Sequence, residues 1–243
     1  MPRYFIEVSY KGTLYAGFQV QQNANSIQSE VERALYIFYK QKFILTGSSR
    51  TDAGVHAFQN FFHFDSEVEI REEVYNLNAI LPGDIVINRV FKVAENAHCR
   101  FDAISREYHY HIYQRKNPFL QDRAYYYPYV LDFDLLQQAA AKVLANNDFS
   151  SFSKRNTQVK SFICEIHYSE WVIEGDCLVY KVKANRFLRG MVKGLVGTML
   201  QVGRKKISVA DFTSIIEAKD CTLADFSVIS DGLFLNKVEF LDL

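Results

Sequence analysis

Apolar and polar positions along the chain follow two different periods. Stretches with alternating apolar residues, or with mostly β-branched and aromatic ones, predict strands at 4–10, 43–46, 58–64, 85–93, 101–113, 162–172, 177–184 and 233–241. Apolar residues three and four positions apart predict helices at 26–39, 71–79, 132–145, 186–202 and 208–218. Ser26 is the expected N-cap of the first helix, because a serine hydroxyl can accept a hydrogen bond from a backbone N–H there. The sequences at 81–84 and 174–176 predict turns.

The order of these elements predicts the fold class. Strands and helices interleave, no linker rich in proline, glycine or serine separates them, and no repeat of fixed period is found. The pattern predicts an α+β protein in which two halves are joined through one sheet. For a chain of 243 residues we expect a single catalytic domain, with an N-terminal half at about 1–96 and a C-terminal half at about 97–243.

The charges are balanced overall but unevenly distributed. The 28 basic and 28 acidic residues give a net charge of zero, which does not by itself indicate a nucleic-acid partner. Between 181 and 206, however, there is no acidic residue, and the basic ones are Lys181, Lys183, Arg186, Arg189, Lys193, Arg204, Lys205 and Lys206. Either this stretch makes one surface of the protein basic, or it forms a solvated helix face balanced by acids elsewhere.

Several other classes of protein are not indicated. We expect a cytoplasmic protein without a membrane span, because no signal peptide and no apolar stretch of about 20 residues is seen. The four cysteines form no C-x-x-C pair, so buried thiols are expected rather than disulfides or a zinc site. His109 and His111 share a strand face without a third metal ligand at recognisable spacing. A Ser/His/Asp hydrolase is not indicated either, because no G-x-S-x-G motif is found.

The polar segment at 48–57 is the first candidate for chemistry. It joins two apolar strands, and such loops often carry functional groups on a rigid support. It holds Asp52 between Arg50 and Gly54, with His56 four residues after the aspartate. On spacing alone a tight turn is the favoured interpretation, and a catalytic carboxylate is the alternative.

The second candidate is the predicted helix around 185–197. With about 100° per residue, one side would carry Arg186, Arg189 and Lys193 together with Gly190 and Gly197. Each glycine inside a helix costs about 1 kcal/mol relative to alanine, so another group is expected to approach the backbone closely. Packing of a neighbouring element is favoured; an RNA backbone or an active-site aspartate is the functional alternative.

Together these segments resemble the TruA family of tRNA pseudouridine synthases. The matching runs extend along nearly the whole chain, and the run from Arg50 to His56, Arg-Thr-Asp-Ala-Gly-Val-His, is highly specific. The others are Ser9-Tyr10-Lys11-Gly12, Gly17-Phe18-Gln19, Leu81-Pro82-Gly83-Asp84-Ile85, Arg100-Phe101-Asp102-Ala103, Arg106-Glu107-Tyr108-His109-Tyr110, Asp148-Phe149-Ser150-Ser151-Phe152 and Met191-Val192-Lys193.

The resemblance implies a fold and an activity. The expected fold is the pseudouridine synthase fold, with two related, ferredoxin-like halves around a shared, mainly antiparallel sheet and a central basic cleft. The expected activity is isomerisation of uridine to pseudouridine at tRNA positions 38–40, in the anticodon stem-loop. The implied partner is tRNA, bound by a homodimer, and neither a cofactor nor a metal is implied.

The resemblance also implies roles for particular residues. The catalytic aspartate falls on Asp52, the active-site tyrosine on Tyr108 and the active-site basic residue on Lys193. Arg50 matches an arginine that holds the RNA after the target nucleotide leaves its stack. The expected substrate-binding residues are Arg50, Tyr108, Arg189, Arg186 and His56. The sequence leaves open whether Lys193 or Arg189 is the cation that acts with Asp52.

Three positions depart from the usual pattern of the family. Lys193 stands where arginine is usual, Phe18 where tryptophan is usual, and Ser49 where glycine is usual. Lysine keeps the positive charge but cannot form the two-pronged hydrogen bond that arginine makes with a carboxylate. Two alternative functions therefore stay open: a paralogue that modifies a different RNA, and an RNA-binding or folding helper with weak catalysis.

Overall fold

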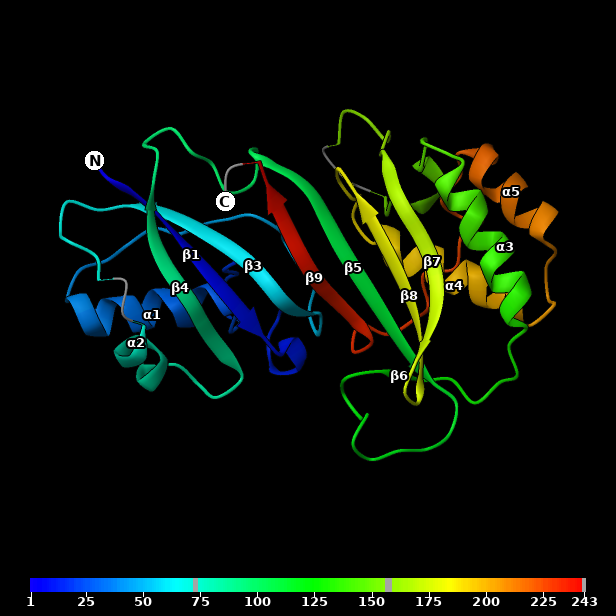
Figure 1. Cartoon of the computed structure of the whole chain (residues 1–243), viewed down its shortest axis with the longest axis horizontal. Helices are drawn as coiled ribbons and strands as arrows, with labels where there is room; N and C mark the ends of the chain where they lie inside the picture. Colours follow the sequence, from blue (N-terminus) through cyan, green and yellow to red (C-terminus); the bar gives the residue numbers. More distant parts are fainter. Residues whose placement is uncertain (72–73, 156–158, 242–243) are drawn as a thin grey trace. The chain divides into compact units, whose positions relative to one another are not determined.

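The computed structural model describes residues 1–71, 74–155 and 159–241 of the chain (Figure 1). Its contacts divide the chain into two compact units, Met1–Ile104 with Phe234–Leu243, and Ser105–Leu233. Each unit combines helices with a mainly antiparallel arrangement of strands. The prediction of an α+β fold is therefore confirmed.

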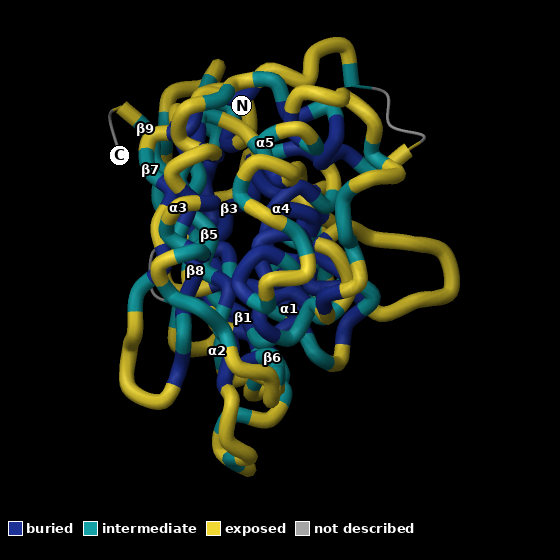
Figure 2. Tube along the Cα trace, turned by 90° about the vertical axis from the view of Figure 1, so that its right-hand side faces the viewer, coloured by how far each residue is buried: buried dark blue, intermediate teal, exposed yellow. Residues whose placement is uncertain are grey.

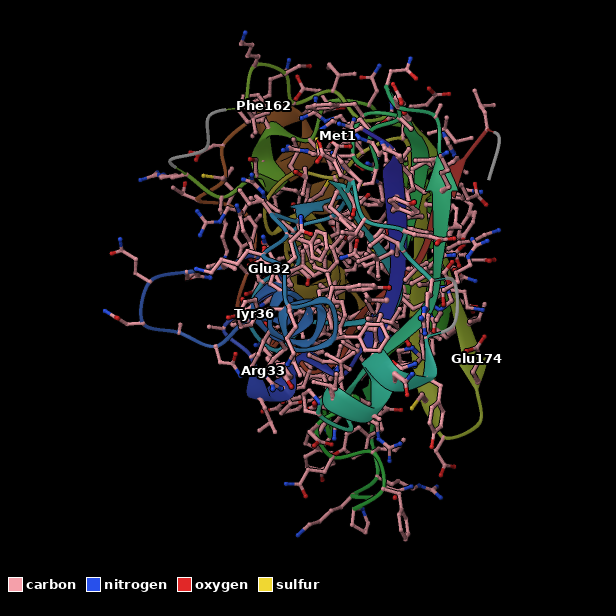
Figure 3. The ribbon with its side chains drawn as sticks, turned by 90° about the vertical axis from the view of Figure 1, so that its left-hand side faces the viewer. Met1, Glu32, Arg33, Tyr36, Phe162 and Glu174 are labelled. Carbon is pink, nitrogen blue, oxygen red and sulfur yellow. The ribbon has the colours of Figure 1, made fainter. Side chains whose placement is uncertain are left out.

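The first unit is built around strand β1 (Arg3–Tyr10). It pairs antiparallel with β3 (His56–Asp65) on one side and with β4 (Ile85–Val93) on the other. The two-residue strand β2 (Thr46–Gly47) pairs with β3, and β9 (Leu233–Phe240) runs parallel to β3. Helices α1 (Ile27–Tyr39) and α2 (Tyr75–Ile80) lie on one side of β1 and β4 (Figures 1 and 3).

Helix α1 begins where the sequence predicts. The Ser26 hydroxyl accepts a hydrogen bond from the Ser29 N–H at 3.1 Å, and the Ser29 hydroxyl accepts one from the Ser26 N–H at 3.0 Å. This reciprocal cap satisfies two N–H groups that the first turn of a helix leaves without partners. The apolar side of α1 is buried in the core, whereas Tyr36, labelled in Figure 3, is 50% exposed.

Two predicted elements of the first unit differ from the structure. The strand expected at 43–46 is observed only as the short β2, which begins at Thr46. The backbone of Leu45 is not paired with a strand, because side chains of α1 form hydrogen bonds with it. The Leu45 N–H donates to Glu32 Oε1 at 3.2 Å, and its carbonyl accepts from Gln28 Nε2 at 2.9 Å. The helix expected at 71–79 is observed as the shorter α2, which begins at Tyr75, and residues 72–73 of the expected range lie outside the described residues.

The second unit is built on three antiparallel strands. Strand β8 (Cys177–Ala184) pairs with β5 (Ala103–Tyr113) and with β7 (Ile166–Glu174), and the short β6 (Tyr125–Tyr126) runs parallel to β5. The β7–β8 hairpin turns at Gly175, whose φ of +56° suits a residue without a side chain. Figure 1 shows helices α3 (Phe133–Leu144), α4 (Met191–Gly203) and α5 (Val209–Ala218) gathered beside β7, which α3 contacts.

Helix α4 is the most buried helix of the second unit. Within it, every residue except Lys193 and Gln201 is buried, which Figure 2 shows as a largely dark-blue tube. A Cβ atom at Gly194 would lie 2.7 Å from the Phe226 ring, and one at Gly197 would lie 2.2 Å from the Asp225 carbonyl oxygen. Close packing of neighbouring chain segments, the favoured interpretation for the glycines of this helix, is thus confirmed for Gly197, and Gly194 is packed in the same way.

The start of α4 corrects the sequence-based prediction. The helix was expected from 186, but it begins at Met191, because Gly190 has a φ of +75° and ends the preceding loop in the left-handed region. The prediction that Arg186, Arg189 and Gly190 share a helix face with Lys193 is therefore wrong. The strand expected from 162 also begins later, at Ile166.

The cysteines of the chain are mostly buried. Cys99, Cys164 and Cys177 are buried free thiols as predicted, whereas Cys221 is half-buried. Among the described residues, no group of three or more histidine, cysteine or carboxylate side chains could hold a metal ion. Within the same residues, no helix has the length and apolar character needed to cross a membrane.

Candidate active site

The loop that carries Asp52 is fixed from below by strands β1 and β3. Asn60 of β3 is fully buried and binds both sides of the Ser49 backbone, accepting from its N–H at 3.2 Å and donating to its carbonyl at 2.8 Å. The same Asn60 amide donates to the Tyr10 hydroxyl at 3.2 Å, which lies 2.7 Å from Thr51 Oγ1. Residues on both sides of Arg50 are thereby held in place.

The segment between β1 and α1 holds the loop from a second side. The Phe18 N–H donates to the Thr51 carbonyl at 3.1 Å. A Cβ atom at Gly12 would lie 2.0 Å from the Val55 carbonyl oxygen, so only glycine permits this approach. The two N-terminal runs that resemble the TruA family, around Gly12 and Phe18, thus support the Asp52 loop.

The loop presents two charged side chains from this fixed backbone. Asp52 and Arg50 are exposed, whereas Thr51 between them is only 8% exposed and faces the core. The Val55 N–H donates to the Asp52 carbonyl at 3.2 Å and closes a tight turn. The tight turn expected from the spacing therefore coexists with a carboxylate that a substrate can reach.

His56, expected to bind substrate, lies in a different environment. It is 1% exposed, and its Nδ1 accepts a hydrogen bond from the Gly12 N–H at 3.1 Å. Its ring stacks on Phe234 with the two centroids 4.5 Å apart. This geometry favours a supporting role for His56 over contact with an RNA approaching from solvent.

The second unit holds Tyr108 on strand β5. Tyr108 is half-buried, lies opposite Val182 of β8, and meets the Phe187 ring edge to face at 4.9 Å. Phe187 belongs to the loop that precedes α4. An aromatic pair in this arrangement is stabilised by the attraction between the edge of one ring and the face of the other, so Phe187 restrains the Tyr108 ring.

The loop at 185–190 is anchored by its first residue. The Asn185 carbonyl accepts from Arg106 Nη1 at 3.2 Å, and its side chain accepts from the Glu165 N–H at 3.0 Å. Arg186 and Arg189 follow in this loop, and both are exposed. The two arginines expected to bind RNA are therefore accessible, although they lie on a loop and not on a helix.

Lys193 lies in the first turn of α4 and is half-buried. Its Nζ donates to Ser230 Oγ at 3.4 Å, and the first turn carries no acidic residue. The partial positive charge at a helix N-terminus disfavours a cation there. Helix stability therefore does not explain a lysine at this position, which is consistent with a role in chemistry or binding.

The structure adds one basic residue that the sequence analysis missed. Lys154 lies against Gly190, where an added Cβ would be 3.0 Å from Lys154 Cγ, and its N–H donates to the Arg189 carbonyl at 3.0 Å. The sequence feature that could have indicated it is its position two residues after Asp148-Phe149-Ser150-Ser151-Phe152, one of the segments that resemble the TruA family. Lys154 extends the basic set of the second unit, which holds Arg186, Arg189 and Lys193.

The buried Cys164 does not supply a nucleophile. Burial raises the pKa of the Cys164 thiol to about 11, against a smaller opposite effect from Arg186. At neutral pH the thiol is therefore protonated, and the nucleophilic form is the thiolate.

Comparison with known proteins identifies relatives along the whole chain. The family model described as tRNA pseudouridine synthase matches residues 139–241. The chain is 41% identical to tRNA pseudouridine synthase A of Parabacteroides distasonis, over 99% of this chain and 96% of that protein. It is 43% identical to tRNA pseudouridine synthase A of Bacteroides fragilis, over 98% and 96% of the two chains. It is 35% identical to tRNA pseudouridine synthase A of Staphylococcus aureus, over 99% and 91%.

Proposed function

Since this chain belongs to the tRNA pseudouridine synthase A family, we propose that it isomerises uridine to pseudouridine in the anticodon stem-loop of tRNA. The observation that carries the proposal is the Asp52 loop. Its carboxylate is exposed, its backbone is held by β1, β3 and the segment before α1, and its sequence is the most specific of the runs that resemble the family. The whole chain acts as one catalytic domain and needs no cofactor.

The chemistry gives each proposed catalytic residue a task. The reaction breaks the bond between uracil N1 and ribose C1′ and forms one between C5 and C1′; C5 then loses its proton and N1 gains one. The Asp52 carboxylate can stabilise positive charge on the sugar, attack C1′ covalently, or accept a sugar proton to give a glycal. Tyr108 stacks on the freed uracil and assists removal of the C5 proton, and Lys193 is the cation that acts with Asp52 in the reaction.

The RNA must also be held with its target base outside the stack. Flipping a base costs a few kcal/mol, which contacts to the displaced nucleotide can offset. Arg50 holds the RNA after the base has left, and the exposed Arg186 and Arg189, with Lys154 beside Arg189, contact phosphates. Because the whole chain has no net charge, we propose that two copies bind one tRNA as a homodimer. The proposed place of this reaction is the cytoplasm.

The test is to incubate the protein with unmodified tRNA and to map pseudouridine. We expect product in the anticodon stem-loop from the wild-type protein and less than a tenth of that turnover from Asp52→Asn, with tRNA binding changed by no more than a few fold. The amide keeps the shape of the side chain but cannot stabilise a positive charge or attack C1′. Asp176→Asn, in the exposed turn after β7, is the matched control and should react like wild type.

Each alternative outcome is informative. Product found only in another RNA would identify a paralogue with a different substrate, and tRNA binding without product would identify an RNA-binding helper. Turnover by Asp52→Asn above a tenth of the wild-type rate would remove Asp52 from the chemistry.

A further inference from the structure

A hollow beside Arg50 lies wholly within the first unit. It has a volume of about 240 Å³ and is lined from three segments by Phe18, Gln19, Gln28, Leu45, Thr46, Gly47, Arg50, His98, Arg100 and Phe101. Small-molecule sites usually enclose about 300–1,000 Å³. This hollow is smaller, so its size suits one part of a larger ligand.

Its lining combines positive charge with an exposed aromatic ring. Arg50 and Arg100 are the two charged residues among those that line it, and both are exposed. Phe101 is 74% exposed, and the Arg100 guanidinium lies over its ring, 5.7 Å from the centroid. Guanidinium groups bind phosphates, and exposed aromatic rings form platforms for unpaired bases.

The exposed ring of Phe101 is connected to the core through the ring of His98. The Phe101 and His98 ring centroids lie 4.2 Å apart, and the His98 ring also contacts the buried ring of His63, with centroids 4.5 Å apart. His98 Nδ1 accepts from the Arg100 N–H at 3.1 Å, and the His98 N–H donates to Asp102 Oδ2 at 2.7 Å. A single exposed phenylalanine needs no explanation, but one braced in this way is a preorganised surface.

We infer that this hollow binds a second, unpaired nucleotide of the RNA, distinct from the target uridine. Its base stacks on Phe101, and Arg100 and Arg50 contact the adjacent phosphates. The inference rests on the proposed function, since it requires RNA as the ligand, and it deepens that function by adding Phe101 and Arg100 as determinants of which RNA is bound.

Stacking is tested by binding of unmodified tRNA to proteins that also carry Asp52→Asn, so that little RNA is converted during the measurement. Phe101→Leu should raise Kd about 5- to 150-fold, the equivalent of about 1–3 kcal/mol per stacked base. Phe101→Trp should bind at least as tightly as the parent. Phe119→Leu is the matched control, because Phe119 is 78% exposed, and it should change Kd less than twofold.

Phosphate contact is tested by the salt dependence of the same binding. Arg100→Gln should reduce the slope of log K against log salt concentration by about 0.7–0.9, the contribution of one phosphate. Phe101→Leu should leave that slope unchanged. Equal slopes for Arg100→Gln and the parent would overturn the phosphate contact, and unchanged binding by Phe101→Leu, or equal weakening by Phe119→Leu, would overturn the stacking site.

The failure of this inference is distinguishable from failure of the proposed function. If the wild-type protein forms pseudouridine in tRNA while Phe101→Leu and Arg100→Gln bind like the parent, the hollow is rejected and the function stands. If the wild-type protein neither binds nor modifies tRNA, both are rejected.

Discussion

At the scale of single residues, two departures from the family pattern lie at buried positions. Phe18 is 1% exposed and stacks on Phe62 with centroids 4.3 Å apart, while a Cβ atom at Gly47 would lie 2.5 Å from its ring. The smaller ring thus fills its site. Ser49 is 8% exposed and is held through its backbone by Asn60, so its side chain is not what positions the loop.

Lys193 is the third departure, and its role is open to a direct test. If it is the cation that acts with Asp52, Lys193→Ala should shift the acidic limb of the rate against pH to higher pH, because a carboxylate that loses a nearby positive charge is protonated more easily. Lys193→Arg should restore the wild-type profile. Single-turnover rates measured across pH would check this.

Arg189 is the competing residue and serves as the control. It is exposed at the end of the loop that precedes α4, whereas Lys193 is half-buried. A shifted acidic limb in Arg189→Ala, together with an unshifted one in Lys193→Ala, would transfer the role to Arg189.

His63 gives a second prediction at this scale, on stability against pH. Burial lowers the pKa of His63 to about 4, with further lowering by His98 and Arg3. In the unfolded chain the pKa is near 6.5. Between these values the unfolded chain holds a proton that the folded chain does not, so the free energy of unfolding should fall as pH decreases, by up to about 3 kcal/mol at pH 4.

Urea unfolding at a series of pH values from about 7.5 to 4 would measure this change. His63→Gln cannot take up the proton, so its free energy of unfolding should depend less on pH in that window. The same pH dependence in His63→Gln and wild type would show that other groups cause the acid sensitivity.

At the scale of elements, helix α4 is defined by what packs against its glycines. The segment around Asp225 is tied to the helix, because the Asp225 N–H donates to Thr198 Oγ1 at 3.0 Å and Gln201 Nε2 donates to Asp225 Oδ2 at 2.9 Å. The Asp225 backbone therefore cannot move easily from its position over Gly197. The glycine provides the space for this contact.

Gly197→Ala should consequently lower the free energy of unfolding. Alanine gains about 1 kcal/mol of helix propensity, but its Cβ would lie 2.2 Å from the Asp225 carbonyl oxygen. Overpacking of this kind costs typically about 1–3 kcal/mol, so after the gain in helix propensity we expect a net loss of up to about 2 kcal/mol. Denaturant unfolding of the purified variant measures it.

Gly83→Ala is the control for this variant. A Cβ atom at Gly83 would meet no atom within 4 Å, so its free energy of unfolding should stay within about 0.5 kcal/mol of wild type. Equal stability of Gly197→Ala and Gly83→Ala would show that the Asp225 segment yields to the added methyl group.

At the scale of the whole molecule, the balance of charge bears on assembly. Phosphate contacts supply much of the affinity of a protein for RNA, and this chain has as many acidic as basic residues. Two copies would double the number of cations that one tRNA can contact. We therefore expect a homodimer.

Light scattering coupled to size exclusion, at micromolar concentration, would measure the assembly. The expected mass is twice the 28.2 kDa of one chain, and addition of tRNA should give one tRNA per two chains. A monomer in both the absence and the presence of tRNA would contradict the prediction.

The sequence by itself determined the class of the fold and most of its elements. Strands such as β4 and helices such as α1 follow from alternation, helical spacing and the Ser26 cap, which depend on residues close together in the chain. The resemblance that led to the family is also carried by short runs, above all the one around Asp52. These features could be predicted because local backbone preferences and side-chain spacing encode them.

The tertiary structure alone decided how the candidate site is held. The Asp52 loop is fixed by Tyr10, Gly12 and Phe18, which precede it by about forty residues, and the hollow beside Arg50 needs Phe101 from about fifty residues later. Burial of His56 and replacement of a strand partner at Leu45 by side chains of α1 arise in the same way. No local period encodes such contacts, because they exist only after the intervening chain has folded and brought distant residues together.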